Sequence, residues 1–212
     1  MLISNLLTDP WAFFAFAVAL LVAFSFHEAA HAFVSLKLGD NTALDDGRVT
    51  LNPLAHLDPL GTIFLLTLGF GWGKPVRINP NNFKNPRIGS LISALAGPLA
   101  NLTLAIIFGL ALRFLHPFAS ANLSSLLSLM VFINLILMIF NLIPIPPLDG
   151  SNILALLIPA QSYHKFARNG TYFLLSLILL SFLGVPVFET IVYAPATWIY
   201  RLIISTQILE IL

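Results

Sequence analysis

The chain has 212 residues, of which 58% are hydrophobic and only 9% are charged, and its formal net charge is +1. A soluble domain carries about a quarter charged residues, so there is too little polar surface here to cover a water-exposed globule. The near-neutral charge gives no indication of a nucleic-acid partner, and the absence of cysteine excludes disulfides and thiolate metal ligands. The composition predicts an integral membrane protein in the lipid bilayer, whose metal sites, if any, use His, Asp or Glu.

Long apolar runs predict three clear membrane spans. A helix needs about 20 apolar residues to cross the bilayer core, and such runs extend from Pro10 to Leu38, from about Ile88 to Leu115 and from about Leu123 to Leu142. The first run is too long for a signal-peptide core and no basic residue precedes it, so we expect a retained helix. Two further C-terminal spans are expected, from Thr171 to Leu183 and from about Phe188 to Leu209.

The segment between the first and second spans is expected to be irregular. Arg48-Val49-Thr50-Leu51 has the composition of a short strand, and the apolar run from Leu60 to Phe70 is too short to cross the membrane comfortably. We therefore expect a short re-entrant or β-hairpin segment near residues 48–78, packed in protein or lining water. The expected fold class is an all-α polytopic membrane protein with a three-helix core and about two further C-terminal spans.

Basic residues predict the orientation in the membrane. Six Lys or Arg residues lie from position 37 to position 87, and Lys165 and Arg168 follow the third span, whereas the N-terminal tail has none. By the positive-inside rule the N-terminus faces the outside and both basic segments face the cytoplasm. Arg201, within the last apolar stretch, does not follow this scheme.

The sequence His27-Glu28-Ala29-Ala30-His31 lies within the first span. Residues four apart on a helix project from the same face, so His27 and His31 can bind one metal ion. Glu28 is placed to accept a proton from a metal-activated water, which is the arrangement of zinc metalloproteases. Ionisable groups within a span cost about 2.5–3.5 kcal/mol on insertion scales and usually serve a function. The alternative is a polar patch satisfied by neighbouring helices, or one near the cytoplasmic end of the span.

Two histidines leave zinc short of a third protein ligand, and Asp149 is the candidate. It follows the proline-rich residues 141–148 and precedes Gly150, which permits a sharp turn. The third span descends to the cytoplasmic side, so Asp149 reaches the side where the two histidines lie. The alternative role for Asp149 is the N-cap of a short helix that starts near Ser151.

Three more polar residues are candidates near the site. Asn101 ends the sequence Gly97-Pro98-Leu99-Ala100-Asn101, where the glycine allows close helix approach. Asn101 or Asn141 could stabilise the oxyanion of a substrate carbonyl, and a structural interhelical hydrogen bond is an equal alternative for Asn101. His56 is expected either to orient a zinc ligand or to form a hydrogen bond with loop backbone.

HEAAH in the first span, GPLAN in the second and NLIPIPPLDG after the third resemble the three signatures of the site-2 protease family, which are membrane-embedded zinc metalloproteases. The last motif matches N-x-x-P-x-P-x-L-D-G at every fixed position. Residues 38–40 and 48–59 also resemble short prokaryotic members that have no PDZ or CBS domain. The likeness covers about residues 10–165.

The resemblance implies one zinc ion per chain on His27, His31 and Asp149, with Glu28 as general base. It also implies regulated intramembrane proteolysis, in which a peptide bond is cut in or beside the transmembrane helix of a membrane-protein substrate. The location implied is a prokaryotic inner (plasma) membrane, with the active site towards the cytoplasm.

A single membrane-embedded metalloprotease domain is expected over residues 1–212, with its catalytic core over about 10–165 and C-terminal spans over about 170–209. Two other functions are compatible with the sequence. A zinc transporter would also place His and Asp within helices, but it needs ligands near the midplane that are open to both sides. An inactive relative would bind transmembrane helices without cutting them.

Overall fold

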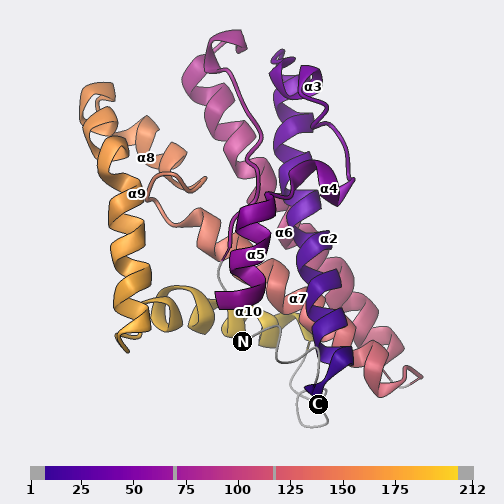
Figure 1. The fold of residues 1–212 in the computed structure, drawn as a ribbon. Helices are drawn as coiled ribbons and strands as arrows, with labels where there is room; N and C mark the ends of the chain where they lie inside the picture. Colours follow the sequence, from indigo (N-terminus) through magenta and orange to yellow (C-terminus); the bar gives the residue numbers. More distant parts are fainter. Residues whose placement is uncertain (1–7, 69–70, 117, 205–212) are drawn as a thin grey trace.

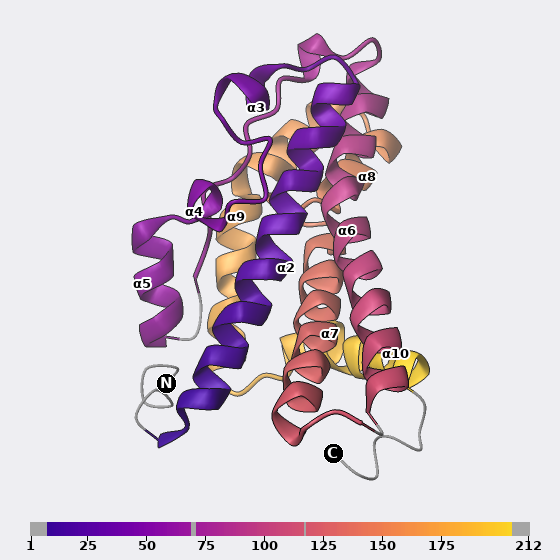
Figure 2. The same cartoon turned by 90° about the vertical axis from the view of Figure 1, so that its right-hand side faces the viewer.

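A computed structural model describes residues 8–68, 71–116 and 118–204 and shows an all-α arrangement (Figure 1). Within these residues, three helices are long and apolar enough to cross a membrane: α2 (Pro10–Lys37), α6 (Pro86–Leu115) and α7 (Ala121–Leu142). They lie side by side and contact one another, as the view turned by 90° also shows (Figure 2). They match the three clear spans expected from the sequence and confirm an all-α polytopic membrane protein.

Side-chain caps fix where each long helix begins. Asp9, Asn85 and Ser120 each accept a hydrogen bond from the backbone N–H three residues later, which would otherwise have no partner in the first turn. Pro10 and Pro86 occupy the first position of α2 and α6. Proline costs no hydrogen bond there and its fixed φ already suits a helix.

Small side chains allow α2 to pack closely on its two neighbours. Most residues that α2 buries are alanine or serine: Ala15, Ala19, Ala23, Ser25, Ala29, Ala32 and Ser35. Membrane helices associate largely through such close packing, because lipid is as apolar as their own side chains. The packing brings the face of α2 that carries His27 and His31 against α6 and α7.

The chain from α2 to α6 forms short helices: α3 (Thr42–Asp45), α4 (Pro53–His56), α5 (Pro59–Leu68) and the 3₁₀ turn η1 (Pro80–Asn82). The expected short apolar run is helical, as α5, and lies beside α2 in Figure 2. An isolated antiparallel bridge between Leu57 and Gly73 brings the two ends of this excursion together. The segment that contains α5 therefore begins and ends at the same place in the fold. Residues 69–70 lie outside the described residues.

The strand expected over Arg48–Leu51 is wrong. This stretch is irregular, and the described residues contain no strand beyond the isolated bridge. The Arg48 guanidinium donates to the Ala55 carbonyl, and the Thr50 hydroxyl accepts the Asn52 N–H at 3.1 Å. These local bonds bend the chain into α4, so its backbone has no neighbouring strand to pair with.

Asp40 organises the return of the chain towards α6. Its buried carboxylate accepts hydrogen bonds from the Thr42 N–H and hydroxyl at 3.1 and 2.6 Å, from the Asn79 N–H at 2.7 Å and from the Asn82 amide at 2.7 Å. Burial opposes ionisation of Asp40, but these donors outweigh it and hold the pKa of the carboxyl below its ordinary value.

The C-terminal part contains α8 (Ser151–Leu157), α9 (Ala160–Phe182), the π-helical turn η2 (Glu189–Tyr193) and α10 (Ala194–Ile204). In both ribbon views α10 crosses the end of the bundle, where it shares a buried apolar cluster with α6 and α7. Among the described residues, neither α9 nor α10 has the length and hydropathy of a membrane span. The C-terminal spans expected over about 170–209 stay a prediction, and residues 205–209 lie outside the described part.

Candidate metal centre

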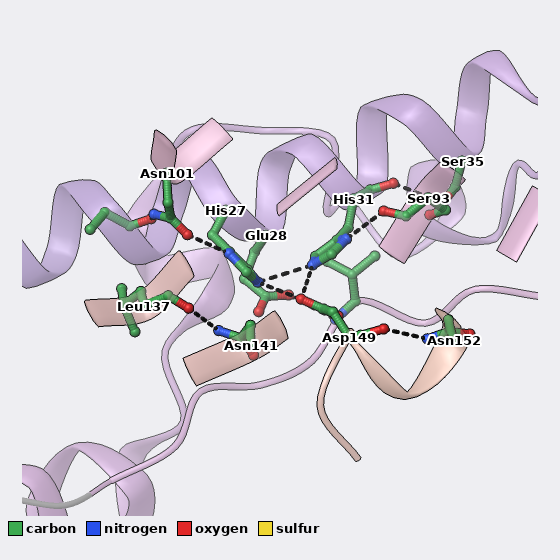
Figure 3. Close-up of polar contacts among 12 residues, drawn as sticks. His27, Glu28, His31, Ser35, Ser93, Asn101, Leu137, Asn141, Asp149 and Asn152 are labelled. Atoms are coloured by element: carbon green, nitrogen blue, oxygen red, sulfur yellow. Dashed lines mark hydrogen bonds and ion pairs between the residues drawn. The ribbon is translucent and has the colours of Figure 1, made fainter. Parts of the chain in front are cut away.

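His27 and His31 project from one face of α2, because four residues make just over one helical turn. Their Nε2 atoms lie 3.0 Å apart. Asp149 Oδ2 lies 3.1 Å from Nε2 of His27 and 3.3 Å from Nε2 of His31 (Figure 3). Both imidazoles are buried, and Asp149 is half-buried. The structure therefore brings together all three residues that the sequence predicts as metal ligands.

The proline-rich turn after α7 carries Asp149 to the histidines. The Gly150 N–H donates to the Asn141 carbonyl at 2.7 Å, which turns the chain back onto the end of α7. A side chain at Gly150 would overlap the Leu142 carbonyl, so only glycine fits this turn. The N-cap of α8 is Gly150 and has no side-chain bond. The Asp149 carboxylate therefore does not cap α8 and is free to bind a metal.

The second ring nitrogen of each histidine faces a hydrogen-bond acceptor. Nδ1 of His27 lies 2.6 Å from Oδ1 of Asn101, and Nδ1 of His31 lies 2.7 Å from the Ser93 carbonyl oxygen. An acceptor at this position requires the proton on Nδ1, so in the neutral form of each ring Nε2 carries the lone pair and points it towards Asp149. Sequence reasoning missed Ser93, because a residue that acts through its backbone carbonyl leaves no signal in its type.

Three electron-rich atoms therefore surround one point. Asp149 Oδ2 is buried and receives no hydrogen bond. When both rings are neutral it repels the two Nε2 lone pairs, and a cation between the three atoms removes this repulsion. The separations of 3.0, 3.1 and 3.3 Å are close to the roughly 3.3 Å edge of a tetrahedron with zinc–ligand distances of about 2.0–2.1 Å. Two imidazoles and a carboxylate, arranged in this way, fit a zinc ion.

Helix α6 reaches the imidazoles at Gly97. A Cβ atom there would overlap Nε2 of His31 and would lie 2.6 Å from Nε2 of His27. The sequence suggests a role for this glycine in helix approach, and the structure shows that the approach takes place at the two histidines themselves.

The Glu28 side chain ends beside His27, His31 and Asp149 (Figure 3). Its Oε2 accepts a hydrogen bond from the Val76 N–H at 3.2 Å. The chain around Val76 forms neither helix nor strand and is held on both sides, by the Lys74 N–H donating to the His56 carbonyl at 2.8 Å and by the bond of Asn79 to Asp40. A buried carboxylate fixed next to a metal site is placed to accept and return a proton.

The two asparagines predicted near the oxyanion use their amide hydrogens elsewhere. Asn101 is fully buried, and its Nδ2 donates to the Ala23 carbonyl and to Oδ1 of Asn134, both at 2.9 Å. Nδ2 of Asn141 donates to the Leu137 carbonyl at 3.0 Å. The contacts of Asn101 support the interhelical alternative, and an oxyanion role for either residue stays a prediction.

His56 follows the second of its two predicted alternatives, and Asn134 was not predicted at all. His56 is buried and its Nε2 donates to the Thr50 carbonyl at 2.9 Å, so its contact lies within the loop and not at a zinc ligand. Asn134 was missed, yet it joins the hydrogen-bond network behind His27 through Asn101. An amide in the middle of an apolar span is the signal that could have found it.

The comparisons with known proteins agree on one family of proteins. The model of peptidase family M50 matches residues 109–185, which include Asp149. The chain is 42% identical to "Putative zinc metalloprotease YwhC" of Bacillus subtilis (strain 168) over 170 residues, which is 76% of this chain and 78% of that protein.

More distant relatives carry the same description. The chain is 35% identical over 136 residues to "Putative zinc metalloprotease Rip2" of Mycolicibacterium smegmatis, where the alignment covers 61% of this chain and about half (52%) of that protein. It is 34% identical over 133 residues to "Putative zinc metalloprotease MJ0611" of Methanocaldococcus jannaschii, covering 62% of this chain and 64% of that protein. No solved structure matches the chain significantly.

Proposed function

Since the chain belongs to peptidase family M50, the site-2 protease type of zinc metalloprotease, we propose that it cuts a peptide bond in or beside the transmembrane helix of a membrane protein. One observation carries this proposal: the turn after α7 brings Asp149 to His27, Glu28 and His31 on α2, a helix long and apolar enough to cross a membrane. A site on such a helix meets substrates that are themselves in the bilayer.

In the proposed mechanism His27, His31 and Asp149 would hold the zinc ion. When bound, zinc would supply a water of lowered pKa and would polarise the scissile carbonyl. Glu28 accepts the proton of the attacking water at its carboxylate and then returns it to the leaving amine. The hydrogen bond from Val76 keeps the Glu28 carboxylate directed at this position.

A helical substrate must unwind before it can be cut, because its carbonyls are engaged in its own hydrogen bonds. The chain around Val76 lies beside Glu28 and forms neither helix nor strand, so its backbone is a candidate to hold an unwound segment by strand addition. Residues 48–51 are not a strand and offer no such edge.

We propose that the end of the bundle where α2 finishes and α6 begins faces the cytoplasm of a prokaryotic inner membrane. The ribbon views place α3, η1 and the start of α9 at this end (Figures 1 and 2). Lys37 ends α2, Arg87 lies at the start of α6, and Lys165 and Arg168 lie in the first half of α9, so these basic residues belong to this end, as the positive-inside rule requires of a cytoplasmic face. The start of α2 then faces the outside.

The test is a cleavage assay in detergent on a panel of single-span membrane proteins, with the zinc content of each preparation measured. The intact protein is compared with Glu28→Gln and with Glu189→Gln, which makes the same change in η2, away from the site. We expect both variants to retain zinc, Glu189→Gln to cut as the intact protein does, and Glu28→Gln to lose activity.

Two outcomes would refute the proposal in different ways. Cleavage by zinc-loaded Glu28→Gln at the intact rate would remove Glu28 as the base. Zinc transport by the intact protein in vesicles, without cleavage of any substrate in the panel, would instead favour the transporter alternative.

A further inference from the structure

A chain of amides runs from the third span to a candidate zinc ligand. Nδ2 of Asn134, on α7, donates to the Met130 carbonyl at 2.8 Å. Oδ1 of Asn134 accepts from Nδ2 of Asn101, on α6, at 2.9 Å, and Oδ1 of Asn101 faces Nδ1 of His27, on α2, at 2.6 Å. Asn101 and Asn134 are fully buried. One continuous hydrogen-bond path therefore crosses all three helices of the bundle.

The direction of this path decides which nitrogen of His27 carries the proton. An amide has a donor end and an acceptor end. With its oxygen towards His27, Asn101 accepts the Nδ1 proton and leaves Nε2 free for a metal. If the Asn101 amide were reversed, its NH₂ group would donate to Nδ1, the proton would move to Nε2, and that nitrogen could not bind zinc.

Asn101 cannot choose its orientation by itself, since its two ends have nearly the same size. Two acceptors hold its NH₂ end: the Ala23 carbonyl and Oδ1 of Asn134. The Asn134 amide is oriented in turn by the Met130 carbonyl, which can only accept. Two backbone carbonyls, that of Ala23 on α2 and, through Asn134, that of Met130 on α7, thus set the direction of the Asn101 amide.

We propose that Asn134 is a positioning residue that keeps His27 in the form able to bind zinc, acting through Asn101. Asn134 touches neither the metal site nor Glu28 in the hydrogen bonds of the described residues, and it lies outside the three sequence motifs. The proposal rests on the proposed role of His27 as a zinc ligand.

The test uses three variants of the full chain in detergent. Asn134→Leu removes one of the two acceptors that hold the Asn101 NH₂ group and leaves only the Ala23 carbonyl. Asn134→Asp keeps both, because a buried neutral aspartic acid accepts through its carbonyl and donates through its hydroxyl. Ser25→Ala is the matched control: like Asn134, Ser25 is buried and donates to the carbonyl four residues earlier, that of Leu21, but it has no recorded bond to the site.

Two quantities are measured besides cleavage. The first is zinc affinity, by competition with a chelating indicator. The second is the tautomer of His27 in the zinc-free protein, from ring ¹⁵N chemical shifts assigned with a His27→Ala variant. Groups that bond a zinc-ligand histidine directly change metal affinity about 10- to 100-fold. Because Asn134 acts one step further away, we expect Asn134→Leu to weaken zinc binding about 10-fold and to raise the fraction of His27 protonated on Nε2.

Asn134→Asp and Ser25→Ala should bind zinc nearly as tightly as the intact protein. Unchanged zinc affinity and an unchanged His27 tautomer in Asn134→Leu would overturn the proposal, as would equal weakening in Asn134→Leu and Asn134→Asp. Asn134→Ala takes the place of Asn134→Leu if the latter does not fold. If His27→Ala binds zinc as the intact protein does, the ligand assignment itself has failed, and this result is distinct from a failure of Asn134 alone.

Discussion

Replacing Gly97 by alanine should damage the metal centre directly. The added Cβ would lie 2.6 Å from Nε2 of His27, whereas ordinary van der Waals contact begins near 3.4 Å. The difference, 3.4 − 2.6 = 0.8 Å, is the distance by which the ring or the helix must move. Metal–ligand distances tolerate only about 0.2 Å, so a shift of this size separates the three ligand atoms.

The magnitude follows from this displacement. A misplacement of about 1 Å costs on the order of 100-fold in rate, so we expect Gly97→Ala to lose at least this much cleavage and to bind zinc more weakly. The measurements are zinc affinity by chelator competition and cleavage of a transmembrane substrate at saturating zinc.

Gly109→Ala is the matched control. Gly109 lies on α6, as Gly97 does, and a Cβ there would also overlap a neighbouring side chain. That neighbour is Ile203 of α10, far from the ligands. Overpacking costs typically about 1–3 kcal/mol of stability, so both variants should melt at lower temperature, while only Gly97→Ala loses zinc. Wild-type zinc affinity in a folded Gly97→Ala protein would refute the reasoning.

Three further predictions follow from the same contacts. Chelation of zinc should lower the melting temperature of the intact protein, since a metal bound only by the folded state stabilises it, and Asp149→Ala should remove most of this difference; an undiminished difference would argue against Asp149 as a ligand. Asp40→Asn should reduce stability by about 1–3 kcal/mol, because in the intact protein the donors of Thr42, Asn79 and Asn82 bond a charged carboxylate, which the variant lacks. The pKa of Asp40 is held below its ordinary value, so its contribution is complete above the unfolded-state pKa of about 3.9 and disappears as pH falls through the folded-state value; thermal melts from pH 7 to pH 3 should therefore converge for the two proteins. His56→Gln should lower stability without changing zinc affinity, as its Nε2 contacts only the Thr50 carbonyl, and weaker zinc binding would restore a role in orienting a ligand.

Local features were predictable from the sequence. Hydropathy and length predict α2, α6 and α7, because the bilayer fixes how many apolar residues a span needs. The spacing of His27 and His31 predicts that both face one metal, since the helix alone determines this geometry. The family is likewise evident from motifs that are short and contiguous.

The segment from 48 to 78 shows where sequence reasoning leaves strand and helix open, and its strand at 48–51 is wrong. A short apolar run with a few β-branched residues is compatible with strand or helix, and neighbours decide between them. Here the bond from Arg48 to the Ala55 carbonyl and the four donors on Asp40 fix the path of the chain. Those partners lie up to 42 positions apart in the sequence, so no local pattern records them.

The sequence by itself determined that this protein spans a membrane and carries the residues of a zinc metalloprotease. Only the tertiary structure decided how these residues are placed: Asp149 facing both Nε2 atoms, Gly97 against the rings, and the path from Asn134 through Asn101 to His27. Residue type gives the chemistry of a side chain and its helical neighbours. Its partners on other helices depend on how the helices pack, and that packing sets which nitrogen of His27 is free.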